Sequence, residues 1–183
     1  MIFYFGTFNP IHNGHLHIAD IVSNTLGKVI FVPAYDSPWK IELKETYEHR
    51  TKMIQLCGKE TSDIEKSLPT PSYTYQTIEK LYENLGKINF IIGYDQFFSL
   101  EKWKHFEILK EKCHFIVIPR NVKQCTSLNE MKEKGWDFQS IAMNCIDISS
   151  SDIRNRVKEG KDIYGLVPKQ VESYIKDNKL YKC

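Results

Sequence analysis

The stretch MIFYFGTFNPIHNGH, from Met1 to His15, passes from an apolar run into the start of an amphipathic segment. The β-prone residues 2–5 predict a buried strand, and apolar side chains recur at helical spacing through residues 13–26. Residues 28–34, KVIFVPA, predict a second buried strand. A strand, a helix and a strand in this order begin a βαβ unit, which indicates a parallel sheet.

The remaining sequence continues this alternation. Further strands are predicted over residues 87–93, 113–119 and 141–148. Helices are predicted over residues 45–58, 74–86, 96–111 (one or two), 127–134, 149–160 and 168–181, and a short strand within 60–72 has no firm position. We therefore expect one domain over residues 1–183. Its fold class is α/β, a doubly wound parallel sheet of about five or six strands with helices on both faces.

Composition argues against several classes of function. The formal net charge is +2 and no long basic run occurs, so nucleic acid is not an expected partner. No apolar run reaches the roughly 18 residues that span a bilayer, so no membrane partner is expected either. Five widely spaced cysteines without a C-x-x-C pair argue against a disulfide framework or a structural zinc site. We expect a cytoplasmic protein, and a homo-oligomer stays an open alternative.

Three widespread catalytic motifs are absent from the sequence. There is no G-x-x-x-x-G-K-[ST], no G-x-G-x-x-G after the first strand, and no G-x-S-x-G. These absences argue against a P-loop phosphotransferase, a dinucleotide-dependent dehydrogenase and an esterase, respectively.

Four polar clusters follow directly on predicted strands. They are Gly6–His15, Pro33–Lys40, Gly93–Asp95 and Ser149–Arg154. Ligands of open parallel sheets bind beyond the carboxyl ends of the strands. The sequence therefore predicts that these clusters gather at one rim of the sheet.

The HNGH segment places two imidazoles, His12 and His15, one helical turn apart at a predicted helix N-terminus. Such a terminus presents unpaired N–H groups that bind phosphate, and Gly14 leaves room for a close ligand. As imidazolium ions or as neutral N–H donors, the histidines could stabilise charge on an attacked phosphorus centre. Two alternatives stay open: histidines that merely cap the helix, and a metal pair, for which the local sequence offers no recognisable third ligand.

Other candidate residues occur in the later clusters. Ser151 and Arg154, three residues apart, could converge on one phosphate group, although the serines could equally cap the helix. Asp95, beside Gly93, could accept hydrogen bonds from a ribose diol or act as an ordinary N-cap. Trp103 could stack on a flat ring or simply belong to the core.

Taken together, these segments resemble the signatures of a known superfamily. Gly6–His15 resembles the H-x-G-H signature of the nucleotidyltransferases, and Ile148–Arg154 resembles their I-S-S-T-x-I-R signature. Within that superfamily the chain is most similar to the bacterial nicotinate (nicotinamide) mononucleotide adenylyltransferases. Ser72–Thr77 resembles their S-Y-T-x-x-T segment, and Gly93–Asp95 followed by Trp103 resembles their G-x-D with a downstream tryptophan.

The resemblance implies a Rossmann-like domain that joins ATP and nicotinate mononucleotide, with Mg²⁺, to give deamido-NAD and pyrophosphate in NAD biosynthesis. It assigns catalysis to His12 and His15. The residues it assigns to ATP are Gly6, Thr7, Phe8, His12, Gly14, His15, Gly93, Asp95, Ser149, Ser151 and Arg154. The residues it assigns to the mononucleotide are Asn9, Lys40, Thr74 and Trp103. No protein ligand to a metal is assigned.

The likeness extends over nearly the whole chain, with some departures. Arg50–Met53 resembles an R-x-x-M segment of the family. The ending, Val167–Ile175 with Leu180–Tyr181, resembles the C-terminus of the family sequences. Trp39 stands where the family often has histidine, Ser151 replaces the signature threonine, and Phe5 replaces a glycine. None of these changes removes a group that the mechanism requires.

Several alternatives remain at this stage. They are a nicotinamide mononucleotide or dual-specificity adenylyltransferase, another H-x-G-H transferase such as phosphopantetheine adenylyltransferase or a glycerol-phosphate cytidylyltransferase, a nucleotide sensor without catalysis, and a metal-dependent hydrolase. Side-chain identity cannot separate the acid from the amide substrate, because backbone groups can recognise either.

Overall fold

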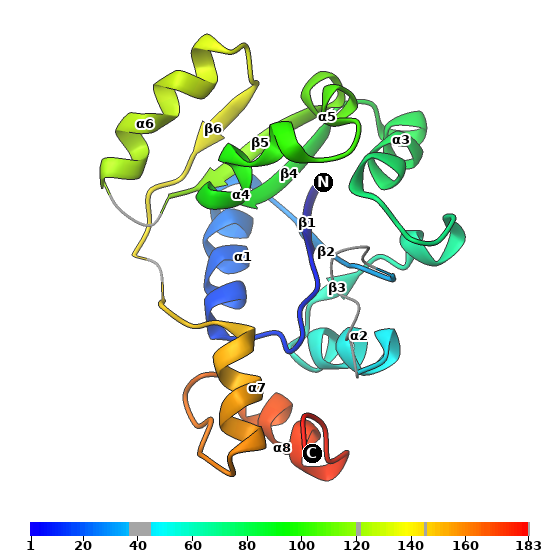
Figure 1. The fold of residues 1–183 in the computed structure, drawn as a ribbon, viewed down its shortest axis with the longest axis vertical. Helices are drawn as coiled ribbons and strands as arrows, with labels where there is room; N and C mark the ends of the chain where they lie inside the picture. Colours follow the sequence, from blue (N-terminus) through cyan, green and yellow to red (C-terminus); the bar gives the residue numbers. More distant parts are fainter. Residues whose placement is uncertain (37–44, 120–121, 145, 183) are drawn as a thin grey trace.

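The computed structural model describes residues 1–36, 45–119, 122–144 and 146–182. Its core is a six-stranded sheet in the order β3-β2-β1-β4-β5-β6, in which every pairing is parallel (Figure 1). The strands are β1 (Ile2–Gly6), β2 (Val29–Pro33), β3 (Glu60–Thr61), β4 (Ile88–Gly93), β5 (Cys113–Ile118) and β6 (Phe138–Ser140). This order places the topological switch point between β1 and β4, where doubly wound sheets bind their ligands.

Helices cover both faces of the sheet. They are α1 (Asn13–Leu26), α2 (Tyr47–Leu56), α3 (Thr74–Leu85), α4 (Tyr94–Phe98), α5 (Phe106–Lys112), α6 (Val122–Glu133), α7 (Ser150–Lys158) and α8 (Lys169–Asp177), with 3₁₀ turns η1 (Ile64–Ser67) and η2 (Leu100–Lys102). None of the helices in the described ranges is both long and apolar enough to cross a bilayer.

Two hydrophobic clusters lie on opposite faces of the sheet, because successive strand residues point to opposite sides. Ile2 and Tyr4 belong to one cluster, together with side chains of α1, α2, α7 and α8. Phe3, between them, belongs to the other cluster, together with side chains of α3, α4, α5 and α6. The predicted Rossmann-like α/β fold with helices on both faces is therefore confirmed.

The four strands predicted over 2–5, 28–34, 87–93 and 113–119 are confirmed within two residues at each end. The open question within 60–72 is answered by β3, a two-residue strand that pairs with β2.

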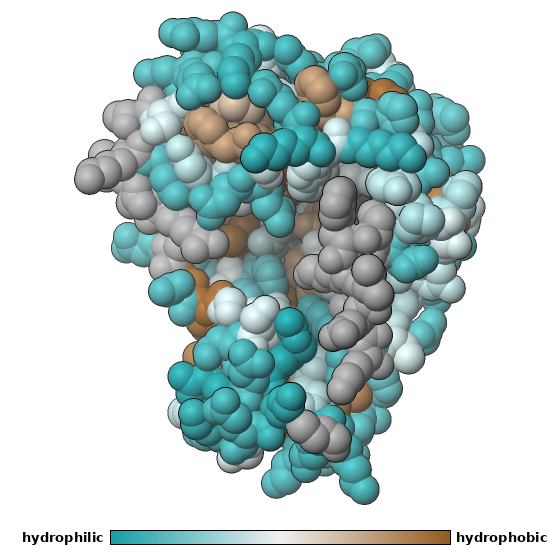
Figure 2. All heavy atoms as spheres, in the orientation of Figure 1, coloured by the Kyte–Doolittle hydropathy of each residue, from teal (hydrophilic) through white to brown (hydrophobic). Residues whose placement is uncertain are grey.

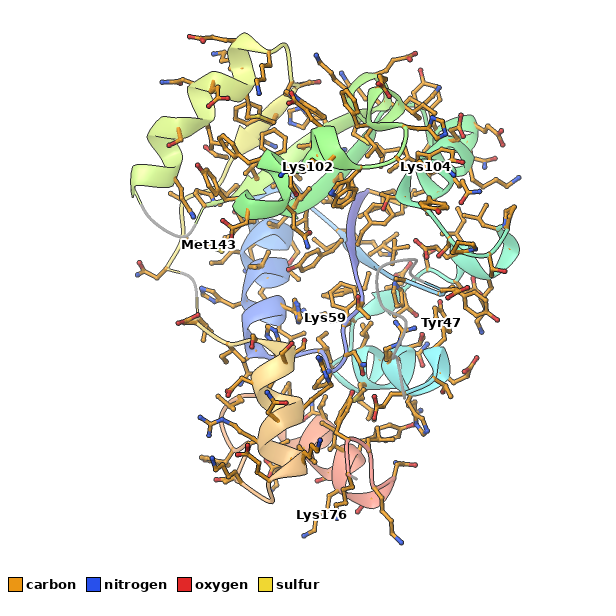
Figure 3. All side chains as sticks on the ribbon, in the orientation of Figure 1. Tyr47, Lys59, Lys102, Lys104, Met143 and Lys176 are labelled. Carbon is orange, nitrogen blue, oxygen red and sulfur yellow. The ribbon has the colours of Figure 1, made fainter. Side chains whose placement is uncertain are left out.

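The strand predicted over 141–148 is wrong. The strand that pairs with β5 is β6, three residues earlier, with Phe115 opposite Phe138 and Val117 opposite Ser140. The apolar pattern that suggested a strand has another cause, because Ile141, Met143 and Ile148 pack against the cluster that contains α1 and α7. Figure 3 labels Met143 beside α1, on the segment that leads from β6 to α7.

Candidate active site

The carboxyl end of β1 leads through a loop into α1, next to a hollow in the surface. Figure 2 shows this hollow between α4 above and α7 below, in the orientation of Figure 1. The loop residues 7–12 connect β1 to α1 at the switch point between β1 and β4. The hollow therefore lies where the fold predicts a ligand.

His12 is the N-cap of α1, and its ring Nδ1 accepts a hydrogen bond from the His15 backbone N–H at 3.3 Å. Burial lowers the pKa of His12 to about 4. His12 is therefore neutral near pH 7, and with Nδ1 acting as acceptor its proton is on Nε2. The capping interpretation is thus confirmed for His12, and the capping bond leaves its Nε2–H as a hydrogen-bond donor.

The two imidazoles form a stacked pair. Their ring centroids are 3.7 Å apart, with an interplanar angle of 21°. The ring of His15 also meets the buried ring of Phe8 edge-on, at a centroid distance of 5.1 Å. Packing on both sides fixes the orientation of His15, which is the pre-organisation that a catalytic group needs.

Gly14 lies in close packing around this pair. A Cβ atom at Gly14 would lie 3.1 Å from ring atoms of His12 and 3.3 Å from the backbone oxygen of Ile146. The sequence suggested that Gly14 makes room for a ligand. The structure adds that it makes room for the His12 ring and for the segment that crosses from β6 to α7.

Gly6 and Phe8 shape the start of the loop. Phe8 has a positive φ of 48°, and its ring is buried among Tyr4, Phe31 and His15. A Cβ atom at Gly6 would lie 2.8 Å from the Phe8 ring, so this position needs glycine. With its ring in the core, Phe8 has only its backbone to offer a ligand.

Arg50 of α2 holds the ends of two strands together. Its guanidinium donates to the Thr7 carbonyl at 2.8 Å and to the Ala34 carbonyl at 2.7 Å. The side chain is 1% exposed, and burial lowers its pKa. Sequence reasoning noted Arg50 only as part of a family segment. Its position three residues before the buried Met53 was the available signal that it faces inward.

The start of α7 meets the loop between β1 and α1. Arg154 donates to the Asn9 carbonyl at 2.7 Å and to the Ser151 hydroxyl at 3.1 Å. The Ser150 hydroxyl donates to the Pro10 carbonyl at 2.9 Å. Ser149 caps α7 by accepting from the Asp152 N–H at 3.0 Å, as the capping alternative predicted. The structure thus brings the Gly6–His15 and Ser149–Arg154 clusters together.

Asn9 is buried, and its side chain points away from the loop surface. Its Oδ1 accepts from the Tyr181 hydroxyl at 2.6 Å, and its Nδ2 lies 3.5 Å from the Glu45 carboxylate. The other oxygen of Glu45 accepts from the Tyr181 N–H at 3.0 Å. Sequence reasoning missed Glu45, and it used Tyr181 only as a family likeness.

The residues assigned to ribose and pyridine lie on the other side of the switch point. Gly93 is the N-cap of α4, with the exposed Asp95 in its first turn. Thr74 begins α3, and the half-buried Trp103 follows η2.

Two ring contacts bring the Thr74 and Trp103 segments together. Lys104 Nζ lies 4.3 Å from the Tyr73 ring centroid, and the Tyr75 and His105 rings are 4.5 Å apart. Lys102 and Lys104 flank Trp103 in the sequence. Figure 3 labels Lys102 close to α4 and Lys104 toward α3. The predicted contact from Lys40 falls outside the described residues, as does Trp39.

Glu65 is a second buried carboxylate that sequence reasoning missed. One oxygen accepts from the Tyr35 N–H at 2.9 Å and from the Ser72 hydroxyl at 2.8 Å. The other oxygen accepts from the Thr77 hydroxyl at 3.1 Å. Ser72 and Thr77 of the S-Y-T-x-x-T segment therefore serve to join α3 to the end of β2.

No metal cage is formed by the described part of the chain. Within it, no group of three or more His, Cys, Asp or Glu side chains could hold a metal ion. The stacked histidines also use one ring nitrogen, His12 Nδ1, for capping. In the described residues, the histidine pair at this end of α1 therefore has no third metal ligand beside it.

A helix N-terminus, two histidines and an arginine thus meet at the switch point of a doubly wound sheet. These features are typical of α/β proteins that bind phosphate groups at the switch point. A family model described as Cytidylyltransferase-like matches residues 3–156. The chain belongs to the cytidylyltransferase-like family and, within it, to the family of its relatives that are named probable nicotinate-nucleotide adenylyltransferases.

Two relatives agree with this placement, and a solved structure agrees with the fold. A "Probable nicotinate-nucleotide adenylyltransferase" of Staphylococcus epidermidis is 40% identical over 194 residues, which cover 99% of this chain and 96% of the relative. Another, of Clostridium botulinum, is 36% identical over 195 residues, covering 97% and 96%. The structure of Plasmodium falciparum nicotinic acid mononucleotide adenylyltransferase complexed with NaAD matches the fold with a TM-score of 0.80. Its sequence identity is 20%, and the match covers 98% of this chain and 96% of that one.

Proposed function

We propose that this chain joins ATP and nicotinate mononucleotide to give deamido-NAD and pyrophosphate, a step of NAD biosynthesis. The observation that carries the proposal is the meeting of His12, His15 and Arg154 around one loop at the switch point. The names of the relatives, which extend over nearly the full chain, support the choice of substrates.

In the proposed reaction, a phosphate oxygen of the mononucleotide attacks the α-phosphorus of ATP in line with the leaving group. A new P–O bond forms, the bond between the α-phosphorus and the bridging oxygen breaks, and pyrophosphate leaves with that bond's electrons. No covalent enzyme intermediate is required, so catalysis rests on positioning and on charge stabilisation.

Each group at the α1 end has a proposed role in this step. The His12 Nε2–H and His15 donate to phosphate oxygens as negative charge develops on the pyrophosphate side. Arg154 and Ser151 hold the β and γ phosphates. Gly6, Thr7, Phe8, Gly14 and Ser149 shape the phosphate site through their backbone positions.

The second substrate is proposed to bind across the switch point. Thr74 and Trp103 face the pyridine nucleotide, with Trp103 stacking on its ring, and Asp95 beside Gly93 contacts a ribose. Lys40 contributes to binding the mononucleotide phosphate. Asn9, which the resemblance assigns to the mononucleotide, has its side-chain atoms engaged by Tyr181 and Glu45, so its proposed role is to hold the loop that meets Arg154.

Mg²⁺ is proposed to enter bound to ATP rather than in a site made by the protein. Mg²⁺ keeps several waters and binds substrate phosphates readily. The hydroxyls and imidazoles at the α1 end suit the phosphates of such a complex better than the ion itself. The bound ion would neutralise phosphate charge, while the residues named above orient the phosphates.

We further propose that residues 1–183 work as one nucleotidyltransferase domain in the cytoplasm. The packing of α8 against the same cluster as α1 and α2 supports a single domain, as does the contact of Tyr181 with Asn9.

The test is pyrophosphate release with ATP and Mg²⁺, with nicotinate mononucleotide and nicotinamide mononucleotide offered separately. We expect turnover with the acid and its loss in His15→Ala. His17→Ala is the matched control, because His17 contacts the Asn144 carbonyl outside the site and should leave turnover intact. Equal rates with both mononucleotides would establish dual specificity instead. No turnover with either, in folded protein that binds ATP, would overturn the proposal and direct attention to other transferase substrates.

A further inference from the structure

The last residues of the described chain reach into the core beneath the proposed ATP site. After α8 ends, the Leu180 N–H donates back to the Ile175 carbonyl at 3.0 Å. Tyr181 follows with a positive φ of 62° and is only 8% exposed. The chain thus turns back on itself and inserts the tyrosine ring below the loop between β1 and α1.

Hydrogen bonds connect this ring to the ATP-binding arginine through a single residue. The Tyr181 hydroxyl donates to Asn9 Oδ1 at 2.6 Å, and the Asn9 carbonyl accepts from Arg154 at 2.7 Å. Asn9 is itself 4% exposed, so water offers little compensation if the hydroxyl is removed.

Glu45 fixes the same arrangement from a second direction. Its carboxylate accepts from the backbone N–H of Tyr181 at 3.0 Å and faces Asn9 Nδ2 at 3.5 Å. Burial, with the nearby charge of Glu45, raises the pKa of Tyr181 far above physiological pH, so its hydroxyl stays protonated and donates. Both polar ends of the Asn9 amide are therefore occupied, and its rotation is prevented.

We propose that Tyr181 is a positioning residue for the ATP phosphate site, acting through Asn9 on Arg154. The inference rests on the proposed function, in which Arg154 holds the β and γ phosphates. Removing the hydroxyl frees the Asn9 amide, and the carbonyl that orients Arg154 loses its fixed position. The effect should fall on ATP and spare the mononucleotide, because Trp103 and the α3 helix that Thr74 begins pack in one hydrophobic cluster, whereas Tyr181 packs in the other, on the opposite face of the sheet.

The primary test compares Tyr181→Phe with Tyr174→Phe. Tyr174 lies on α8 and contacts His49 at 2.9 Å, so its variant also loses one tyrosine hydroxyl contact but none to Asn9. We expect Tyr181→Phe to raise the KM for ATP, and the calorimetric Kd for ATP, by about tenfold. The KM for nicotinate mononucleotide should change by less than about twofold, and Tyr174→Phe should match the parent protein in all three constants.

A double-mutant cycle separates positioning from a general structural effect. In an Arg154→Lys background, Tyr181→Phe should change ATP binding by less than about twofold, because the guanidinium through which it acts is already gone. The proposal is overturned if the tenfold effect persists undiminished in that background. It is also overturned if both substrates are affected equally, or if ATP binding is unchanged.

Two further outcomes are distinguishable. If Tyr181→Phe unfolds at the assay temperature, Glu45→Gln carries the test, because it disturbs the Asn9 amide from the other side. It should give the same ATP-selective change, and the absence of that change would overturn the proposal. If the parent protein binds ATP but shows no turnover, the proposed function fails, whereas calorimetry with ATP still decides the role of Tyr181.

Discussion

His12 should make the stability of this protein depend on pH in a way that one substitution can isolate. The folded protein holds the pKa of His12 at about 4 through burial, against an ordinary value of 6.5. Between these values the unfolded chain binds more protons than the folded one, so the free energy of unfolding rises with pH. The stabilising effect is complete above about pH 6.5 and is lost as the pH falls toward 4.

The size of the effect follows from the two pKa values. Each pKa unit corresponds to about 1.36 kcal/mol, so the full gap is worth about 3 kcal/mol. At pH 5.0, where His12 would be charged in the unfolded chain and neutral in the folded one, about 2 kcal/mol of this is lost. Solvent screens this effect little, because His12 is only 6% exposed.

The variant His12→Asn removes the titrating ring and keeps the cap. Asparagine is a preferred N-cap residue, and its side-chain oxygen can accept from the His15 N–H as the imidazole does. Urea unfolding at pH 7.5 and pH 5.0 would measure the loss of stability in each protein. We expect the parent protein to lose about 2 kcal/mol more than the variant between these two pH values.

The control is His105→Asn, which removes an exposed histidine from a left-handed position that asparagine tolerates. Between pH 7.5 and pH 5.0, the free energy of unfolding of this control should fall by as much as that of the parent protein. Equal losses in the parent protein and in His12→Asn, within about 0.5 kcal/mol, would refute the argument that burial keeps His12 neutral.

Two further substitutions test the packing of the site. Gly14→Ala should lower turnover about tenfold or more, because the added methyl group would displace the His12 ring. The unfolding temperature should change little, because alanine has the higher helix propensity. Unchanged turnover would contradict the close packing. Arg50→Lys should lower the free energy of unfolding in urea by about 2 kcal/mol, because a single ammonium group replaces the guanidinium that donates to two carbonyls. Arg156→Lys, at an exposed pair with Asp152, should cost less than about 1 kcal/mol, and equal costs at the two arginines would contradict the role of Arg50.

The first half of the sheet could be predicted because its signals are local. The strand at β1, the helix at α1 and the strand at β2 each satisfy their own hydrophobic period, and Gly27 ends α1 with a φ of 114°. The predicted strand over 141–148 had a similar apolar pattern, but in the described residues its pairing with β5 stops at the hydrogen bond from the Ile141 N–H to the Val117 carbonyl, at 3.1 Å. The adjacent strand β5 ends at Ile118, and its edge away from β4 is already paired with Phe138–Ser140 of β6. Strand identity depends on an available neighbour, which a single segment cannot reveal.

The candidate site residues also differ in whether their signal is local in the sequence. His12, His15 and Arg154 could be proposed from the sequence, because each lies beside a turn or a helix start. Glu45 and Tyr181 could not, because their link to the loop is a contact with the buried Asn9, and Tyr181 lies 172 residues from that partner. A buried carboxylate such as Glu65 has no distinctive local pattern either, since its partners come from β2 and α3.

The loop from Thr7 to Pro10 explains why these distant residues matter. Its carbonyls at Thr7, Asn9 and Pro10 accept hydrogen bonds from Arg50, Arg154 and Ser150, which belong to α2 and α7. Its conformation is therefore set by side chains from elsewhere, because the loop has no strand or helix ladder of its own. Arg154 is both held by this loop and proposed to hold phosphate. ATP binding and the packing of α7 must then depend on each other, and a change in either should be felt in both.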